Sequence, residues 1–114
     1  IHLPGAMDHL TMTTTTTKIR IEILVDAPLV RRITEAAESV GVTGYTLMRT
    51  IGGSGRGGRW SEDQLTGAQT KVVFVTVTGP RRADALIEAL KPVLDSHGLM
   101  LTRSEVEVVR GDRF

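Results

Sequence analysis

Residues 18–26 read Lys-Ile-Arg-Ile-Glu-Ile-Leu-Val-Asp, and the predicted fold is built outward from this stretch. Its β-branched residues alternate with charged ones, which is typical of a β-strand with one buried face. Asp26 is suited to cap a helix that follows, and Pro28 is suited to the first helical turn. Gly41 is expected to end this helix. The apolar residues that share one face of the helix are Leu29, Ile33, Ala36, Ala37 and Val40.

The same plan of strand, helix, glycine and strand recurs further along the chain. A strand over residues 45–51 completes the first half, and a third strand over residues 70–78 is apolar enough to be central. Pro80 opens a second helix, Gly98 closes it, and a last strand follows over residues 99–109. The order β-α-β-β-α-β predicts an α+β, ferredoxin-like fold, in which a four-stranded antiparallel sheet carries both helices on one face.

The second face of the predicted sheet also carries apolar side chains. Leu24, Val73, Val75 and Val77 are expected to point that way. A face open to water would not favour them. We therefore expect this face to pack against other subunits.

The composition excludes several classes of protein. With 114 residues, the chain is expected to be one domain. It has no cysteine, which rules out disulfides, thiolate metal sites and thiol catalysis. No run approaches the roughly 20 apolar residues that cross a bilayer, and no signal-peptide core is visible, so a cytoplasmic location is the expectation. The net charge of +1 does not suggest a general binder of polyanions.

The N-terminal residues are expected to lie outside the domain. Residues 1–11 resemble a remnant of cloning or of protease cleavage, and Met12 is expected to be the native start. Residues 12–17, which include a run of threonines, are expected to form a disordered lead-in. The domain itself is predicted to cover residues 18–114.

Residues 52–59, Gly-Gly-Ser-Gly-Arg-Gly-Gly-Arg, suggest a binding site for a small anion. Glycines allow positive φ angles, so successive main-chain N–H groups can turn inward and form an anion nest. Arg56 and Arg59 add planar guanidinium groups that suit phosphate or carboxylate. The connection continues to about Gln69, which is longer than usual, so it is either functional or a flexible surface linker.

Three further features lie in this connection. Trp60 is either an anchor for a target protein or packed against its own domain. Ser61 and Gln64 have the spacing of a capping box, which predicts a short helical turn. Residues 53–58 fit G-x-G-x-x-G, but no long helix follows, so we do not interpret them as a dinucleotide motif.

Residues 41–47, Gly-Val-Thr-Gly-Tyr-Thr-Leu, together with the glycine-rich stretch, resemble the PII signal-transduction family. In that family a Gly-x-Thr-Gly-x-Thr segment leads into the second strand and then into the flexible T-loop. The element order matches as well, so the similarity covers residues 18–110. The resemblance implies a homotrimer that binds adenine nucleotides in clefts between its subunits. It also implies that a T-loop, about residues 52–69 here, changes shape with the ligand and docks on a target such as a transporter or an enzyme.

The resemblance further implies which residues bind the nucleotide. Thr46 matches a threonine that approaches the nucleotide, and residues 53–56 match the start of the loop that wraps the phosphates. Residues 71–72 begin the strand after the T-loop, where neighbouring main chain faces the adenine. Arg103 and Arg110 are candidates for phosphate contacts from the last strand. The implied nucleotide-binding residues are Thr46, Gly53, Ser54, Gly55, Arg56, Lys71, Val72, Arg103 and Arg110.

Three departures from nitrogen-regulating PII proteins narrow the implied function. The B-loop signature Thr-Gly-x-x-Gly-x-Gly-Lys is missing, and residues 95–100, DSHGLM, stand in its place, which argues against tight binding of the ATP triphosphate. Residues 52–69 contain no tyrosine for uridylylation. The glutamine that helps to hold magnesium and 2-oxoglutarate has no clear match. These features are similar to a divergent PII-like branch that is associated with bicarbonate transporters and carboxysomes.

The similarity to that branch implies a set of ligands. Its members bind AMP, ADP or related nucleotides, and some respond to bicarbonate. ADP and AMP are therefore the ligands that we expect here, with ATP as a further candidate. Arg56 and Arg59 are the candidates to hold bicarbonate, because a guanidinium beside main-chain N–H groups suits a planar anion. The expected role is regulation of inorganic-carbon uptake or of a related target.

Other proteins with this fold remain as alternatives. A nitrogen-regulatory PII protein is the first of them. An acylphosphatase-like hydrolase needs a phosphate cradle after the first strand, where residues 25–28, Val-Asp-Ala-Pro, contain neither glycine nor arginine. An RRM-like RNA binder needs aromatic side chains on the sheet, and few are available. A metal-handling trimer of the CutA type is disfavoured by the absence of cysteine and by the single histidine, His97, that remains after residues 1–11 are set aside. We therefore expect a regulatory protein with no catalytic residues, no metal site and no nucleic-acid partner.

Overall fold

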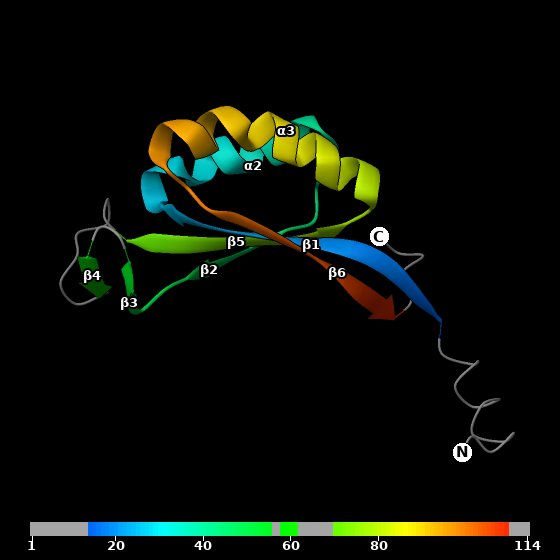
Figure 1. The fold of residues 1–114 in the computed structure, drawn as a ribbon, viewed down its shortest axis with the longest axis horizontal. Coiled ribbons are helices and arrows are strands. Elements are labelled where there is room, and N and C mark those ends of the chain that lie inside the picture. Colours follow the sequence, from blue (N-terminus) through cyan, green and yellow to red (C-terminus); the bar gives the residue numbers. More distant parts are fainter. Residues whose placement is uncertain (1–13, 56–57, 62–69, 110–114) are drawn as a thin grey trace, which may run out of the picture.

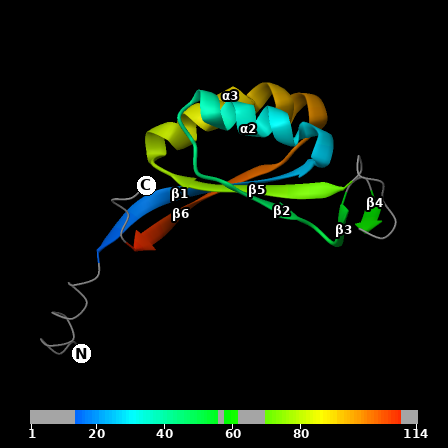
Figure 2. The same cartoon turned by 180° about the vertical axis from the view of Figure 1, so that it is seen from behind.

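Two helices cover one face of a four-stranded antiparallel sheet (Figures 1 and 2). The computed structural model describes residues 14–55, 58–61 and 70–109. The strand order is β2-β5-β1-β6, so the predicted α+β, ferredoxin-like arrangement is confirmed. The elements are β1 (Thr15–Asp26), η1 (Ala27–Leu29), α2 (Val30–Ser39), β2 (Thr46–Arg49), β3 (Gly52–Gly55), β4 (Gly58–Ser61), β5 (Lys71–Thr78), α3 (Pro80–His97) and β6 (Leu101–Val109).

The core lies between the sheet and the helices. Alternation along β1 sends Ile21 and Ile23 into this layer, where neither has any exposed surface. Phe74 on β5 lies opposite Ile23 in the strand register and is also fully buried. The helices contribute side chains from one face each. The buried core consists of Ile19, Ile21, Ile23, Val25, Ile33, Ala37, Val42, Phe74, Ala83, Leu86, Leu90 and Val93.

The first strand starts earlier than the sequence predicts. β1 begins at Thr15, and residues 15–17 pair with β6 from Val109 to Glu107. The expected disordered lead-in is therefore strand over these three residues, because threonine suits a pleated strand and β6 supplies a partner along its whole length. Residues 1–13, which include the expected cloning remnant and Met12, lie outside the described residues.

The helix boundaries lie where the glycines and prolines predict them, but the predicted helix cap at Asp26 is not formed. Pro28 lies in the first turn of η1, as predicted. Gly41 and Gly98 follow the two α-helices with φ angles of 85° and 61°, which glycine adopts without strain. Asp26 occupies the N-cap position but makes no side-chain cap hydrogen bond. Its carboxylate is instead held by Lys71 across the neighbouring strand.

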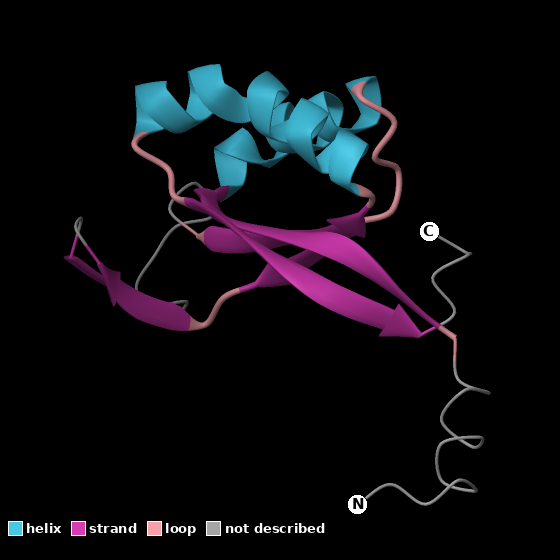
Figure 3. Cartoon of the chain, turned by 45° about the vertical axis from the view of Figure 1, so that its right-hand side comes forward, coloured by secondary structure: helices cyan, strands magenta, loops and turns pink. Residues whose placement is uncertain are grey.

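The glycine-rich stretch forms a β-hairpin rather than an irregular loop. β3 and β4 pair as a separate two-stranded sheet, with Gly53 opposite Trp60 and Ser54 opposite Arg59. Figure 3 shows this hairpin projecting from the end of the main sheet, away from both helices. The predicted helical turn over residues 61–64 lies outside the described residues except for Ser61, which is the last residue of β4.

The face of the sheet that points away from the helices is partly apolar. Val73, Val75 and Val77 alternate with buried residues of β5, and none of them is fully buried. Leu24 on β1 is 37% exposed and Met48 on β2 is 43% exposed. We call the face that these five residues form the open face.

None of the helices in the described residues has the length and apolar character that crossing a membrane requires.

Candidate functional site

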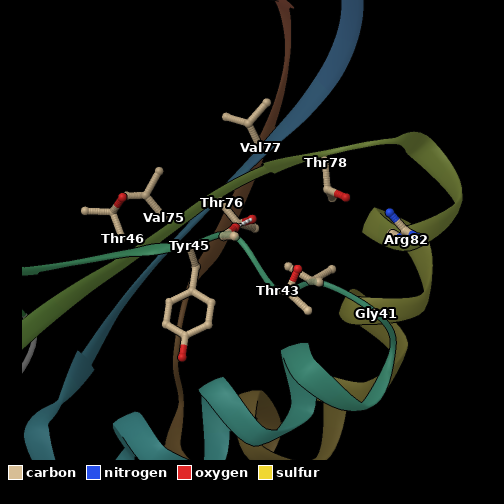
Figure 4. A pocket seen from close by; sticks show the side chains of 11 residues that line it. Gly41, Thr43, Tyr45, Thr46, Val75, Thr76, Val77, Thr78 and Arg82 are labelled. Carbon is tan, nitrogen blue, oxygen red and sulfur yellow. Dashed lines mark hydrogen bonds between the residues drawn. The ribbon is translucent and has the colours of Figure 1, made fainter. Parts of the chain in front are cut away.

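A hollow of about 480 Å³ lies between β5, the start of β2 and the start of α3 (Figure 4). It is lined by residues 41–46, by residues 75–78 and by Arg82. The first segment contains most of the Gly-Val-Thr-Gly-Tyr-Thr-Leu stretch that the sequence analysis singled out. Pockets for small molecules have volumes of roughly 300–1,000 Å³, so this hollow is large enough to hold one.

Buried contacts hold the first wall of the hollow in place. The hydroxyl of Thr76, which is 2% exposed, donates a hydrogen bond of 2.6 Å to the carbonyl oxygen of Gly44. The ring of Tyr45 stacks on Phe74 with 5.3 Å between ring centroids. Thr46, a predicted nucleotide-binding residue, follows directly and is exposed on the wall of the hollow. The contacts leave the Thr46 side chain free to meet a ligand on a fixed backbone.

The far end of the hollow contains polar groups that the sequence analysis did not single out. Thr78 is 7% exposed, and its hydroxyl makes no hydrogen bond within the described residues. The guanidinium of Arg82 is exposed, and among the described residues it has no ion-pair partner. A Cβ atom built on Gly41 would lie 3.3 Å from Arg82 Nε, so the arginine lies directly against this glycine. Gly41 and Arg82 are far apart in the chain and meet only in the folded protein. No local sequence pattern could therefore have predicted that they lie together at the hollow.

A second polar cluster holds the base of the β3–β4 hairpin. The main-chain N–H and the hydroxyl of Thr50 both donate to the carbonyl oxygen of Lys71, at 3.1 and 2.9 Å. Trp60 Nε1 donates to the hydroxyl of Thr50 at 3.2 Å. A Cβ atom on Gly53 would lie only 2.4 Å from the indole ring, so the ring occupies the space above that glycine. Of the two interpretations of Trp60, packing within its own domain is the one that the structure shows.

Lys71 is engaged within the same cluster. Its ammonium lies 2.7 Å from the carboxylate of Asp26 and 5.3 Å from the centroid of the Trp60 ring. The neighbouring Val72 is paired with Val25 on one side and with Arg49 on the other. The two predicted residues therefore lie beside the hairpin, with Lys71 already neutralised by a carboxylate.

Over the described residues 52–55, the backbone does not form the predicted anion nest. Gly53, Ser54 and Gly55 are exposed, but they are extended strand residues paired with β4. A nest needs successive N–H groups to point to the same side, and an extended strand points them to alternate sides. Arg59 is exposed on β4 opposite Ser54. Arg56 and Arg110 lie outside the described residues.

Arg103 lies at the opposite edge of the sheet from Thr46. It is on β6, where its guanidinium holds the carboxylate of Asp84 at 2.9 Å. Because β5 and β1 separate β2 from β6, the two edges are roughly 14 Å apart at the usual strand spacing. One chain therefore does not bring Arg103 and Thr46 to the same ligand.

No group of three or more histidine, aspartate or glutamate side chains that could hold a metal ion occurs in residues 14–55, 58–61 and 70–109. His97, at the end of α3, instead lies with Nε2 at 3.3 Å from a guanidinium nitrogen of Arg32.

The family model for nitrogen regulatory protein P-II matches residues 11–113. The chain belongs to the P-II family. The resemblance that residues 41–47 suggested is thereby confirmed, although a search of curated proteins returns no match.

Solved structures share the fold of this P-II protein. CPII, a nitrogen regulatory PII-like protein from Thiomonas intermedia K12, was solved bound to ADP, AMP and bicarbonate. It superposes with a TM-score of 0.79 at 18% sequence identity, and the match covers 89% of this chain and 96% of CPII. A PII-like signalling protein from Thermus thermophilus gives a TM-score of 0.73 at 19% identity, with coverage of 88% and 97%. At these identities the likeness establishes a common fold.

Proposed function

We propose that this P-II family protein is a regulatory protein and a member of the divergent PII-like branch. In this proposal it forms a homotrimer and binds ADP or AMP in the clefts between its subunits. The hollow beside Thr46 is the observation that carries the proposal. It is built on the stretch that resembles the nucleotide site of the family, it is large enough for an adenosine, and its apolar walls suit a flat base. The fold neighbour CPII was solved with ADP, AMP and bicarbonate, which supports the same ligand class here.

The proposed nucleotide places its base in the hollow and its phosphates along β2 towards the hairpin. Val75 and Val77 supply apolar surface on the wall of the hollow. The residues at the hairpin end are Gly53, Ser54, Gly55 and Arg56, with Lys71 and Val72 beside them on β5. Lys71 lies near this path, although it would have to exchange its ion pair with Asp26 for one with a phosphate. ATP is the weaker candidate, because the B-loop signature for its triphosphate is missing.

The proposed trimer completes the site from a second subunit. Arg103 and Arg110 belong to the far edge of the sheet, so the β6 edge of a neighbouring subunit must carry them to the nucleotide. Releasing Arg103 from Asp84 costs little, because that ion pair is exposed. The open face supplies apolar surface that association of subunits would bury.

We further propose that bicarbonate binds beside the phosphates and that the hairpin belongs to a T-loop over about residues 52–69. Arg56 and Arg59 are the candidates to hold the bicarbonate. Because the hairpin projects from the sheet, a ligand at its base could alter the surface that it offers to a target protein. Inorganic-carbon uptake, through a transporter or a carboxysome-related protein, is the process that we propose it regulates.

Calorimetry and sedimentation test the proposal together. We expect ADP and AMP to bind a trimer, and we expect Thr46→Val to weaken binding roughly tenfold through the loss of one hydrogen bond. Thr34→Val is the matched control, because the exposed Thr34 hydroxyl on α2 donates, among the described residues, only to the Arg31 carbonyl. The absence of any adenine-nucleotide binding at millimolar concentration would contradict the proposal, as would a monomer at all concentrations.

A further inference from the structure

We propose that the end of the hollow nearest α3 is a binding site for a small oxyanion, a phosphate or a carboxylate group, held by Arg82 and Thr78. This site does not rest on the proposed nucleotide function. Thr78 and Lys71 are at opposite ends of β5, seven residues apart, which corresponds to roughly 23 Å of strand. The hairpin groups that we assign to nucleotide phosphates are therefore far from it.

The first turn of α3 has several features that favour the binding of an anion. Gly79 is at the N-cap and has no side chain to accept from the first N–H groups, and Pro80 follows it. The first turn contains no acidic residue, but it does contain Arg81 and Arg82. Two cations at the positive end of a helix dipole are unfavourable for the folded chain by itself. A bound anion would reverse the sign of that interaction and would satisfy the free N–H groups.

A hydroxyl of a buried residue at the same place has no partner. Thr78 is the last residue of β5 and is 7% exposed, yet its hydroxyl makes no hydrogen bond within the described residues. Figure 4 shows this hydroxyl and the guanidinium of Arg82 at the same end of the hollow. Within the described residues, no side-chain N or O atom that is fully shielded from solvent lacks a hydrogen-bond partner, so the Thr78 hydroxyl is open to the hollow and not sealed in the core. It can therefore donate a hydrogen bond to a ligand oxygen in the hollow.

The guanidinium of Arg82 is placed to meet that ligand. Arg20 and Arg103, which are also partly exposed, each hold a carboxylate. Arg82 holds none among the described residues, and no acidic residue is part of the described lining of the hollow. Its side chain instead lies against Gly41, where a Cβ atom would come within 3.3 Å of Nε. The absence of a side chain at Gly41 thus leaves room for the guanidinium at the hollow.

The chemistry of the site favours a small ion over a large polyanion. One guanidinium fork, one hydroxyl and the first N–H groups of a helix match the oxygens of a single phosphate or carboxylate group. The rest of the lining of the hollow includes the apolar side chains of Val42 and Val77. A polyanion would need several charges along a surface, and the chain has a net charge of only +1.

An NMR titration of the full chain tests the proposal. Sodium phosphate and sodium acetate are each added at constant ionic strength, with sodium chloride as the reference. We expect saturable shifts in the amide signals of residues 78–83 and 41–44 with one or both oxyanions. Adenosine and AMP, added separately, distinguish a nucleotide phosphate from a free oxyanion: shifts of the residue 79–83 amides with AMP but not with adenosine would identify the phosphate group of a nucleotide as the ligand, whereas shifts confined to the lining residues 41–46 and 75–78 with both would identify binding of the base alone.

Three variants assign the effect to the proposed groups. Arg82→Gln should weaken oxyanion binding at least tenfold, and Thr78→Val should weaken it several-fold. Arg81→Gln is the matched control, since it removes an equal charge from the same turn but does not line the hollow, and it should change affinity less than threefold. Non-saturable shifts in the wild-type chain, or equal losses in the two arginine variants, would overturn the proposal. The phosphate and acetate titrations of these variants contain no nucleotide, so their outcome is independent of whether ADP binds.

Discussion

At the scale of single residues, Gly53 has no space for a side chain because the indole ring of Trp60 covers it. A Cβ atom on Gly53 would lie 2.4 Å from the ring, whereas one on Gly55 would meet nothing within 4 Å. We expect Gly53→Ala to displace the indole and to shift the fluorescence of Trp60, the only tryptophan, to longer wavelength. Gly55→Ala is the matched control and should leave the spectrum unchanged. Identical spectra for the two variants would contradict this packing.

Thr76 is a second residue whose role depends on one contact. Its buried hydroxyl donates to the carbonyl oxygen of Gly44 and fixes the wall of the hollow. Thr76→Val keeps the shape but leaves that carbonyl without its donor, so we expect the free energy of unfolding to fall by about 1 kcal/mol. Denaturant unfolding measures this, with Thr102→Val, at an exposed position on β6, as the control. Equal midpoints for the two variants would mean that the hydrogen bond adds nothing to stability.

At the scale of elements, we expect the β3–β4 hairpin to open more readily than the four-stranded sheet. Two strands of four residues are marginal in isolation, so the hairpin depends on the contacts of Trp60 with Thr50 and Gly53. We expect Trp60→Ala to speed hydrogen exchange of the β3 and β4 amides and to leave β1 and β5 protected. Arg59→Ala, one residue away and at an exposed position, should not do so. Uniform loss of protection across both sheets would show that the hairpin unfolds only with the whole domain.

The elements also show which parts of the structure the sequence can predict. β1 and the two helices follow from the spacing of Ile and Leu residues and from the glycines after the helices, because each of those signals is local. The hairpin sequence shows no alternation of apolar and polar residues, since half of its residues are glycines without side chains. The pairing of its strands depends instead on the contact between Trp60 and Gly53, which are seven residues apart. The candidate site was only partly predictable for a related reason. Thr46 is marked by a motif, whereas Arg82 becomes part of the hollow only when α3 packs beside Gly41.

At the scale of the whole molecule, the residues proposed to bind one nucleotide lie on two opposite edges of the sheet in the single chain. The hollow with Thr46 is at the β2 edge, and Arg103 is at the β6 edge of the same sheet. The open face between these edges exposes Leu24 and Met48. An assembly that buries the open face could also bring one subunit's β6 edge to the next subunit's β2 edge. The proposed trimer therefore links association and nucleotide binding, so a change that prevents one should weaken the other.

Val73 tests that link, because it lies on the open face between Met48 on β2 and Leu24 on β1 and does not line the hollow. Val73→Asp would place a carboxylate among these apolar side chains and bury it in the proposed interface, at a cost of several kcal/mol. We expect a folded monomer by sedimentation and circular dichroism, with ADP affinity reduced at least tenfold. Met100→Asp is the matched control, since Met100 is 76% exposed in the connection after α3 and should tolerate the same charge. If Val73→Asp remained trimeric, the open face would not be the interface. If it became monomeric and still bound ADP with the wild-type affinity, the nucleotide site would belong to one chain alone.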